Sequence, residues 1–292
     1  MILQTNKTTL FLLLILLALI SGCAGQQTRT TSSVVDYLYP RESKTIVQPA
    51  IPILNIPIKV GIAFVPEQPA RSRGINIWSG VLGGGALTEV NKTDLLEKVA
   101  DNFRKHKFVS DIEVIPSAYL TAGGSFSNLE QIRTMYGVDV IALVSYDQVQ
   151  FTDEGLLSLT YWTLVGAYIV SGEKNDTSTM LDTAVYDIQS KKMLFRAPGT
   201  SNIKGISTPI NLSEELRADS IRSFQRATDD MITNLDVQLL NFREKIKAKP
   251  NQVKVVHRKG YSAAGALGIF ELVVMICFLV LAFVRNKSNK TC

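Results

Sequence analysis

The sequence predicts an α+β fold in which helices pack on one face of a mixed sheet, with an N-terminal signal peptide and one C-terminal transmembrane helix. The chain has 292 residues, and the part between its two apolar ends is long enough for one domain. In that part, segments with the two-residue period of strands alternate with segments of helical period. Their order is strand, helix, strand, helix, then strands, a hairpin and a terminal helix, which favours helices lying against one sheet.

Residues 1–22 have the order of a lipoprotein signal peptide. Lys7 precedes an apolar core over 10–20, which is too short and wrongly flanked for an ordinary membrane span. The core ends in four residues with the pattern of the bacterial lipobox, Ile20, Ser21, Gly22 and Cys23. The small residues fit the cleft of a signal peptidase, and the Cys23 thiol is the group that is acylated. The alternative is a plain secretory signal that ends in a chance cysteine.

Acylation at Cys23 predicts attachment to the membrane, because several acyl chains exceed the two signals needed for stable anchoring. It also predicts contact with the lipoprotein export machinery. Ala24 follows the cysteine, where bacterial lipoproteins retained in the inner membrane carry Asp. We therefore expect an inner-membrane precursor and a mature form at the outer membrane or cell surface of a Gram-negative envelope.

Residues 23–57 are predicted to form a tether and an extended segment. Residues 24–33 are polar and indicate a flexible tether. Residues 34–57 contain four prolines, which favour an extended chain over a helix. A tether of some thirty residues would reach about 100 Å when fully extended.

Residues 58–247 are predicted to form the folded domain. Strands with apolar and β-branched alternation are expected at 59–65, 112–115, 138–151, 157–170 and 179–187. Helices with one apolar face are expected at 93–107, 127–136 and 213–247. Ser127 and Glu130 form a capping-box pattern that predicts the start of the second helix. Residues 187–190 and 193–197 predict a hairpin that turns at Lys191 and Lys192.

The placement of cysteine and histidine predicts no metal site and no cofactor in the domain. The three cysteines lie at positions 23, 277 and 292, so none falls within 58–247. His106 and His257 are too few and too far apart in the chain for a typical zinc site. The glycines at 83–85 precede no phosphate-binding motif and indicate a flexible connection.

No set of residues in the sequence predicts an enzyme. We expect His106 to be a solvated histidine at a helix end and His257 to lie in a linker outside any folded pocket, which leaves a catalytic triad without its base. Two pairs of adjacent carboxylates are present, Asp153 with Glu154 and Asp229 with Asp230. Side chains of neighbouring residues point in different directions, so such pairs do not converge by local geometry.

A basic linker is predicted at 248–262. The net charge of +5 arises mostly in the C-terminal third, where Lys and Arg are frequent between Arg243 and Lys259. A basic run beside an apolar span favours contact with a membrane surface. No aromatic residues are interleaved with the run, so we do not expect nucleic-acid binding.

Residues 263–285 predict a transmembrane helix, followed by a basic tail at 286–292. The apolar run from Leu267 to Val284 spans about 27 Å as a helix, interrupted by Glu271 alone. Small residues precede it, namely Ala263, Ala264, Gly265 and Ala266. They would weaken the first turns of the helix, as an intramembrane protease requires, or else support helix–helix packing.

The small-residue motif, apolar span and basic tail resemble the sorting signal that rhombosortases, a group of rhomboid-type serine proteases, cleave. Together with the lipobox and the segments "RTTSSVVDYLYP" (29–40) and "YWTLVGAYIVSGEKNDTSTMLDTAVYDIQSKKMLFRAPG" (161–199), they resemble the rhombotarget lipoprotein family. The resemblance implies that a rhomboid-type intramembrane protease cuts the chain within 263–266. The usual paired glycines are here Ala264 and Gly265, so the cleaved bond is not fixed by the motif.

The sequence therefore predicts a non-enzymatic envelope lipoprotein whose domain contacts an unidentified envelope protein. The order of elements is similar to that of the small periplasmic domains of the curli-secretion lipoprotein and of penicillin-binding-protein activator lipoproteins, which bind partner proteins. Two alternatives stay open, a permanent two-anchor protein that bridges membranes and an envelope enzyme with a dispersed site. A type I membrane protein is disfavoured by the lack of cysteines in the domain.

Overall fold

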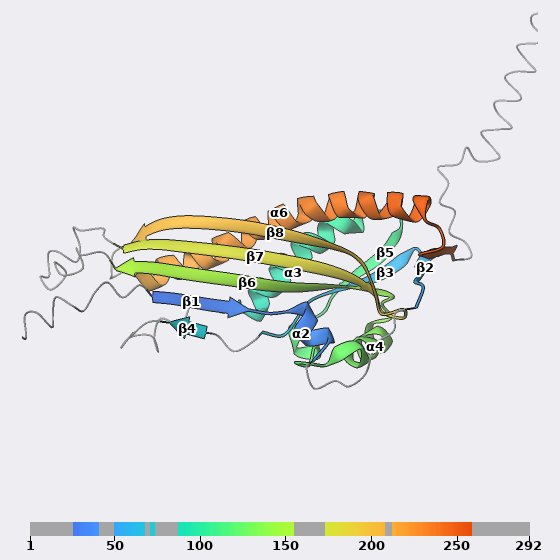
Figure 1. The fold of residues 1–292 in the computed structure, drawn as a ribbon, viewed down its shortest axis with the longest axis horizontal. Helices are drawn as coiled ribbons and strands as arrows, with labels where there is room; N and C mark the ends of the chain where they lie inside the picture. Colours follow the sequence, from blue (N-terminus) through green and yellow to red (C-terminus); the bar gives the residue numbers. More distant parts are fainter. Residues whose placement is uncertain are drawn as a thin grey trace, which may run out of the picture.

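The computed structural model describes residues 26–40, 50–67, 71–73, 87–154, 173–207 and 212–258 (Figure 1). The predicted signal peptide, lipobox, strand at 157–170 and C-terminal span lie outside the described residues. Among the helices that are described, none is both long and apolar enough to cross a membrane.

The sheet is built on the long central strand β6 (Val140–Glu154). Strand β7 (Glu173–Asp187) pairs antiparallel with β6 over its whole length, from Val140↔Asp187 to Glu154↔Glu173. Strand β8 (Lys192–Ser207) continues the antiparallel order beyond β7. These three strands extend for about 50 Å, at roughly 3.4 Å per residue.

Two pairs of strands share the other edge of β6. At one end, β3 (Ile58–Phe64) pairs parallel with residues 140–144, and β5 (Val109–Val114) pairs with β3. At the other end, β1 (Gln26–Thr31) pairs antiparallel with residues 147–152, and β4 (Arg71–Arg73) pairs with β1. The sheet is therefore mixed, as predicted.

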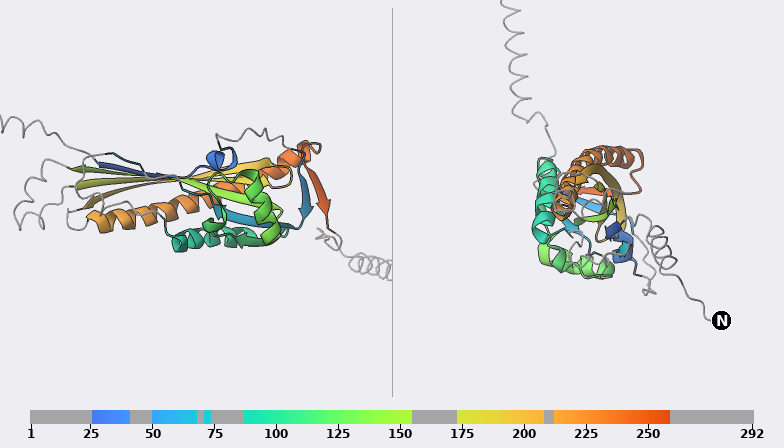
Figure 2. Two further views of the ribbon diagram at one scale, coloured as in Figure 1. Left: turned by 90° about the horizontal axis from the view of Figure 1, so that it is seen from below. Right: turned by 90° about the vertical axis from the view of Figure 1, so that its left-hand side faces the viewer.

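Helices α3 (Glu89–Arg104) and α6 (Leu212–Ala248) lie side by side against one face of the sheet (Figure 2). Helices α2 (Val34–Leu38) and α4 (Ser125–Tyr136) pack against the opposite face, near the short 3₁₀ helix Ser117–Tyr119. Alternate residues of the strands supply the two cores. Ile62 of β3 belongs to the core under α3 and α6, whereas its neighbour Ala63 belongs to the core under α2 and α4. The predicted sheet with packed helices is confirmed, and the structure adds the second helical layer.

A small second sheet closes one end of the domain. It consists of β2 (Ile53–Ile56) and β9 (Lys254–His257), which pair in parallel. Arg258 continues this arrangement, since its backbone N–H donates to the carbonyl of Ile56 and its guanidinium donates to Asp139 at 2.7 Å. Part of the predicted basic linker is thus a strand of the folded domain.

The prediction of a flexible tether is wrong for the residues that the structure describes between 26 and 33. Gln26–Thr31 is a strand inside the sheet, and Arg29 donates through Nε to Asp147 of β6 at 2.9 Å. The next residues are fixed as well, because the backbone N–H of Tyr146 donates to the Ser32 hydroxyl at 3.0 Å. The partner strand lies more than a hundred residues away in the chain, so local composition does not reveal this pairing.

The predicted extended conformation is also wrong for Val34–Leu38, which forms α2. The Ser33 hydroxyl accepts a hydrogen bond from the backbone N–H of Asp36 and so caps the helix. The Tyr37 hydroxyl donates to Asn128 of α4 at 2.7 Å, in a buried contact between the two helices. Burial raises the pKa of the Tyr37 hydroxyl. The prolines begin at Pro40, after the helix has ended.

Two local predictions of turn and cap chemistry are wrong. Helix α4 begins at Ser125, so Ser127 lies within it, and Glu130 pairs with Arg133 at 3.4 Å instead of capping the helix. The hairpin turns over Ile188–Lys191, where the backbone N–H of Ser190 donates to the Asp187 carboxylate at 2.9 Å. Residues 188–190 are therefore turn rather than strand.

The other predicted elements that fall within the described residues are confirmed, with ends that differ from the predicted limits by up to six residues. They are the strands at 59–65, 112–115, 138–151 and 179–187 and the helices at 93–107 and 213–247. Helix α3 starts one turn earlier than predicted, because the Thr88 hydroxyl accepts from the backbone N–H of Asn91 and caps it.

A charged cluster fixes the start of α3. The Lys92 ammonium lies 2.8 Å from Glu67 and 3.1 Å from Glu89. Burial lowers the pKa of Lys92, but the hydrogen bonds and charges of the two carboxylates outweigh it and raise that pKa. For Glu89 the effects are reversed. Burial raises its pKa, but hydrogen bonds from the Ser117 hydroxyl and Lys92, together with the charge of Lys92, outweigh burial and lower that pKa.

The first turns of α6, which include Leu216 and Ser220, cover polar strand residues. Gln148 is buried and donates to the Thr179 hydroxyl at 2.8 Å, and it accepts from the Ser220 hydroxyl at 2.6 Å. Gln150 donates to the carbonyl of Leu216 at 2.7 Å. These bonds satisfy the buried amides and set the register of α6 on the sheet.

Candidate functional site: an apolar cavity with a basic rim

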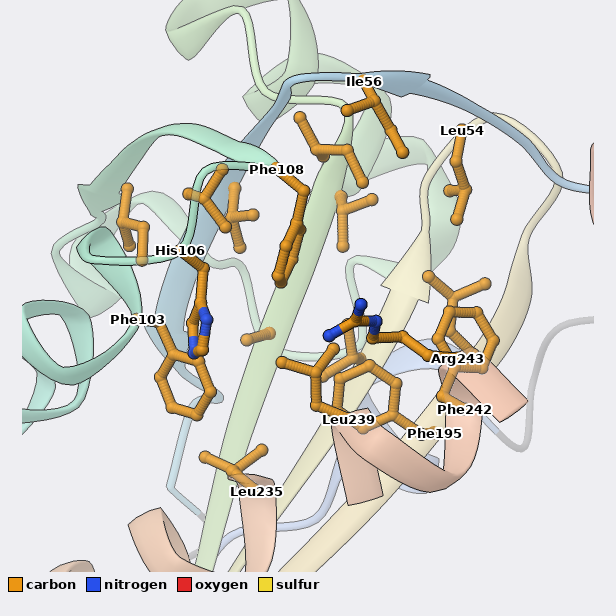
Figure 3. A pocket seen from close by; sticks show the side chains of 18 of the residues that line it. Leu54, Ile56, Phe103, His106, Phe108, Phe195, Leu235, Leu239, Phe242 and Arg243 are labelled. Carbon is orange, nitrogen blue, oxygen red and sulfur yellow. The ribbon is translucent and has the colours of Figure 1, made fainter. Parts of the chain in front are cut away.

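An apolar cavity of about 560 Å³ lies between the sheet and the helices α3 and α6, at the end of the domain that carries β2 and β9. Figure 3 shows Phe103, His106 and Phe108 on one side, and Leu239, Phe242 and Arg243 of α6 on the other. Apart from Thr183 and a few basic side chains, every residue that lines the cavity is apolar.

The regular periods of the chain create these walls. Alternate residues of β3 and β6, such as Ile62 and Ala142, point to the same face of the sheet and form the floor. Leu235, Leu239 and Phe242 follow one another at helical spacing along α6. Leu54 and its neighbours on β2 and β9 close the end. Five parts of the chain that are separate in sequence thus contribute to one cavity.

Five basic side chains line the cavity, and we call them the basic rim: His106, Lys107, Arg243, Lys247 and His257. Arg243 and Lys247 stand four residues apart on α6 and therefore share one face of the helix. Both are exposed, and neither makes an ion pair among the described residues. The lining includes no Asp or Glu. Figure 3 shows the Arg243 guanidinium extending from α6 toward Phe108.

The two histidines do not lie where the sequence predicted. His106 is stacked between two rings, with centroid distances of 5.7 Å to Phe103 and 5.2 Å to Phe108. Its Nε2 is buried, 3.8 Å from a carboxylate oxygen of Asp236, so it is not a solvated capping residue. His257 belongs to β9 and lines the cavity, which corrects its placement outside any pocket.

The lining favours binding of an apolar group over chemistry. The volume of the cavity falls within the range of about 300–1,000 Å³ that is typical of small-molecule sites. Thr183 carries the one hydroxyl in the lining, and that hydroxyl faces the sulfur of Met231 at 2.8 Å. An apolar ligand that enters the cavity is removed from water together with the apolar side chains that line it, which contributes about 25 cal/mol per Å² of apolar surface buried.

No group of three or more potential metal ligands occurs in the part of the chain that the structure describes. Asp229 and Asp230 have different partners, as predicted for neighbours in one element. Asp229 pairs with Lys98 at 2.5 Å, while Asp230 accepts from the backbone N–H of Thr200 at 2.8 Å. Asp153 and Glu154 end β6, away from the cavity.

The predicted processing residues Ile20–Cys23 and 263–266 lie outside the described residues, but the structure shows where the chain approaches them. Strand β1 begins at Gln26, three residues after Cys23. The described chain ends at Arg258, five residues before Ala263 and beside the cavity. The described residues nearest to the two predicted processing sites therefore lie at opposite ends of the domain.

The sequence assigned the rim residues of α6 to a general basic run. Their spacing distinguishes Arg243 and Lys247 from the rest of the basic run. At helical spacing they lie next to the apolar residues Leu239, Phe242 and Ile246, on the cavity side of α6. Lys245, between them, does not line the cavity.

No family model matches the chain, and no curated protein matches it. Solved structures with a similar arrangement include a Xanthomonas campestris protein of the DUF330 family, with a TM-score of 0.33 and 10% identity, covering 69% of this chain and 98% of that one. A neuraminyllactose-binding hemagglutinin homolog from Helicobacter pylori has a TM-score of 0.36 and 9% identity, covering 73% and 97%. A lipoprotein from Neisseria meningitidis has a TM-score of 0.25 and 12% identity, covering 56% and 96%. At these scores the likenesses transfer no function to this chain.

Proposed function

We propose that the chain is an exported envelope lipoprotein, acylated at Cys23 and cut near Ala264 and Gly265 by a rhomboid-type intramembrane protease. Its domain works by binding a ligand or an envelope protein and not by catalysis. After processing, the lipidated domain resides at the outer membrane or cell surface. The proposal joins the sequence motifs at the two ends to the geometry of the domain between them.

One observation supports the proposal: Gln26 and Arg258, the described residues nearest to the two predicted attachment points, lie at opposite ends of the domain. Gln26 pairs with Thr152 near the end of β6, whereas Arg258 contacts Asp139 just before β6 begins. The strand between these points is about 40 Å long, at roughly 3.4 Å per residue. A precursor anchored at Cys23 and by its C-terminal helix is therefore held at both ends.

Cleavage of the C-terminal helix would change what the domain can reach. Only Ala24 and Gly25 separate Cys23 from β1, so the N-terminal end stays within about 10 Å of its anchor. The end with the cavity, released from its helix, can then swing away from the membrane by the length of the domain. This supports a temporary span, whose removal exposes the cavity end.

The same geometry weakens the alternative of a permanent bridge between membranes. That alternative relied on an N-terminal tether with a reach of about 100 Å. Because the chain enters the sheet at Gln26, there is no tether of that length. The distance that the protein can bridge is set mainly by the domain, which is about 50 Å long along its strands.

The test is the intact mass of the protein from envelopes, compared between the wild type and Gly265→Phe. A wild-type mass that starts at acylated Cys23 and stops within 263–266, together with a longer chain in the variant, is the expected result. Gly260→Phe lies outside the predicted cleavage region and serves as the matched control, which should be processed normally. A wild-type mass that still includes Cys292 would make the helix permanent and overturn the proposal.

A further inference from the structure

We infer that the cavity binds a single-chain anionic amphiphile, with its acyl chain among the apolar walls and its negatively charged head group at the basic rim. The inference deepens the proposed function and rests on it, because it uses the membrane attachment to supply the ligand. The ligand is a fatty carboxylate or a lysophospholipid with a phosphate head group.

The dimensions fit one acyl chain. The cavity runs along α6 from Leu235 to Lys247, which is about 18 Å at 1.5 Å per residue. A lipid chain in a membrane crosses one leaflet, about half of a hydrocarbon core of roughly 30 Å. One chain therefore occupies the length of the cavity and leaves its head group at the Lys247 end.

The charge of the rim selects the head group. Arg243 presents a planar guanidinium that can donate two parallel hydrogen bonds to a carboxylate or phosphate. Lys247 adds a second cation one turn further along α6. No carboxylate of the lining neutralises them. An uncharged apolar ligand would leave these two cations unused, whereas an anionic head group pairs with both.

The acyl chains on Cys23 are at the wrong end to fill the cavity. The anchor precedes Gln26, about 40 Å along β6 from the residues of the cavity floor, which is more than twice the roughly 15 Å that one lipid chain crosses in a leaflet. The apolar segment 267–284 would form a helix about 27 Å long and 10 Å wide, several times larger than the cavity volume of about 560 Å³.

The membrane is close enough to supply the ligand before processing. Eight residues separate Arg258 from Leu267, where the predicted span begins, so the cavity end lies within about 30 Å of the bilayer in the uncut precursor. The end of the domain that carries the basic rim is then close to the membrane lipids. Cleavage would let the loaded domain leave the membrane surface.

The test is photo-crosslinking in envelopes that contain the full-length protein. The probe is palmitate with a diazirine in the middle of its chain, and crosslinked peptides are mapped by mass spectrometry after irradiation. We expect crosslinks on α6 between Leu235 and Phe242 and on the strands of the cavity floor. Crosslinks confined to 267–284 would show contact with bilayer lipid alone and overturn the inference.

Competition defines the acyl part and the head group separately. Unlabelled fatty acids of increasing length should compete better by about fourfold per added methylene until the cavity is full. Hexadecanol tests the need for charge, and palmitoyl lysophosphatidylglycerol distinguishes a phosphate head group from a carboxylate. Equal competition by hexadecanol and palmitate, or stronger competition by a two-chain phospholipid, would contradict the assignment.

Variants connect these effects to named residues. Arg243→Gln with Lys247→Gln should weaken crosslinking of palmitate about tenfold and leave that of the corresponding alcohol unchanged, while Lys245→Gln on the same turns should change neither. Ala142→Phe fills the floor and should abolish crosslinking of both probes. Should Ala142→Phe not fold, Leu239→Trp at the α6 wall serves the same purpose.

The intact mass of the same samples separates the two proposals. A normally processed chain without cavity crosslinks overturns the ligand and leaves the lipoprotein function standing. A chain that is neither acylated at Cys23 nor shortened overturns the proposed function, whichever peptides are crosslinked.

Discussion

Gly199 of β8 marks the closest approach of the sheet to α6, and its replacement by alanine should be one of the most disruptive small changes in the protein. A Cβ atom at this position would lie 2.2 Å from the carbonyl oxygen of Ala227 and 2.5 Å from the Cβ of Met231. Two of the three nearest atoms belong to the helix backbone, so no side-chain rotation relieves the clash.

The cost follows from the movement that the clash requires. Contacts of a Cβ under 3.0 Å essentially never occur, so α6 must move away from β8 by about 1 Å. A gap of that size forfeits a quarter to a half of each dispersion contact in the core around Met231. Overpacking alone costs about 1–3 kcal/mol, so we expect Gly199→Ala to lower the free energy of unfolding by about 3 kcal/mol. For a domain of this size that lowers the Tm by about 6–12 °C.

The assay is thermal unfolding of the full chain followed by circular dichroism, with Gly137→Ala as the control. Gly137 ends α4 with φ of 65°, and its Cβ would meet nothing within 4 Å. That variant therefore bears only the cost of a left-handed backbone with a side chain, about 1–2 kcal/mol. A Tm loss for Gly199→Ala no larger than that of Gly137→Ala would refute the close helix–sheet approach.

Three further predictions concern stability. Gln148→Met removes the partner of the buried Ser220 hydroxyl and should cost about 1–3 kcal/mol in urea unfolding. Tyr37→Phe leaves the Asn128 oxygen without one donor and should cost about 1 kcal/mol in the same assay. Glu89→Gln should be less stable than the wild type above about pH 5, because the folded protein lowers the pKa of Glu89. The difference in stability between the two proteins should shrink as the pH falls below the usual pKa of Glu, because the wild type then loses the stability that ionised Glu89 contributes.

Two of these predictions have a direct control variant. Tyr39→Phe changes an exposed tyrosine near the same helix and should have little effect. Glu244→Gln, exposed on α6, should show no comparable dependence on pH. A Gln148→Met variant as stable as the wild type would mean that the polar bonds under α6 contribute nothing. If the difference in unfolding free energy between Glu89→Gln and the wild type widens toward low pH, the direction of the pKa change is contradicted.

The sequence by itself predicted the elements whose period is long and uninterrupted. The apolar alternation of β6 and the helical spacing of α6 are local properties of the chain, and both elements form within a few residues of the predicted limits. Local signals also predicted that adjacent carboxylates would diverge, since neighbours in one element point apart. The lipobox and the C-terminal span are local motifs as well, and they stay predictions because they lie outside the described residues.

The pairing partners of these elements became known from the tertiary structure. The polar composition of Gln26–Thr31 is typical of a tether, but its strand is stabilised by β6, more than a hundred residues later. The basic segment Lys254–His257 becomes a strand because β2 offers it a free edge. The cavity arises where residues from five separate parts of the chain, between Leu54 and His257, surround one volume. Local composition cannot show this, because the free energy of such contacts depends on distant partners that only the folded chain brings together.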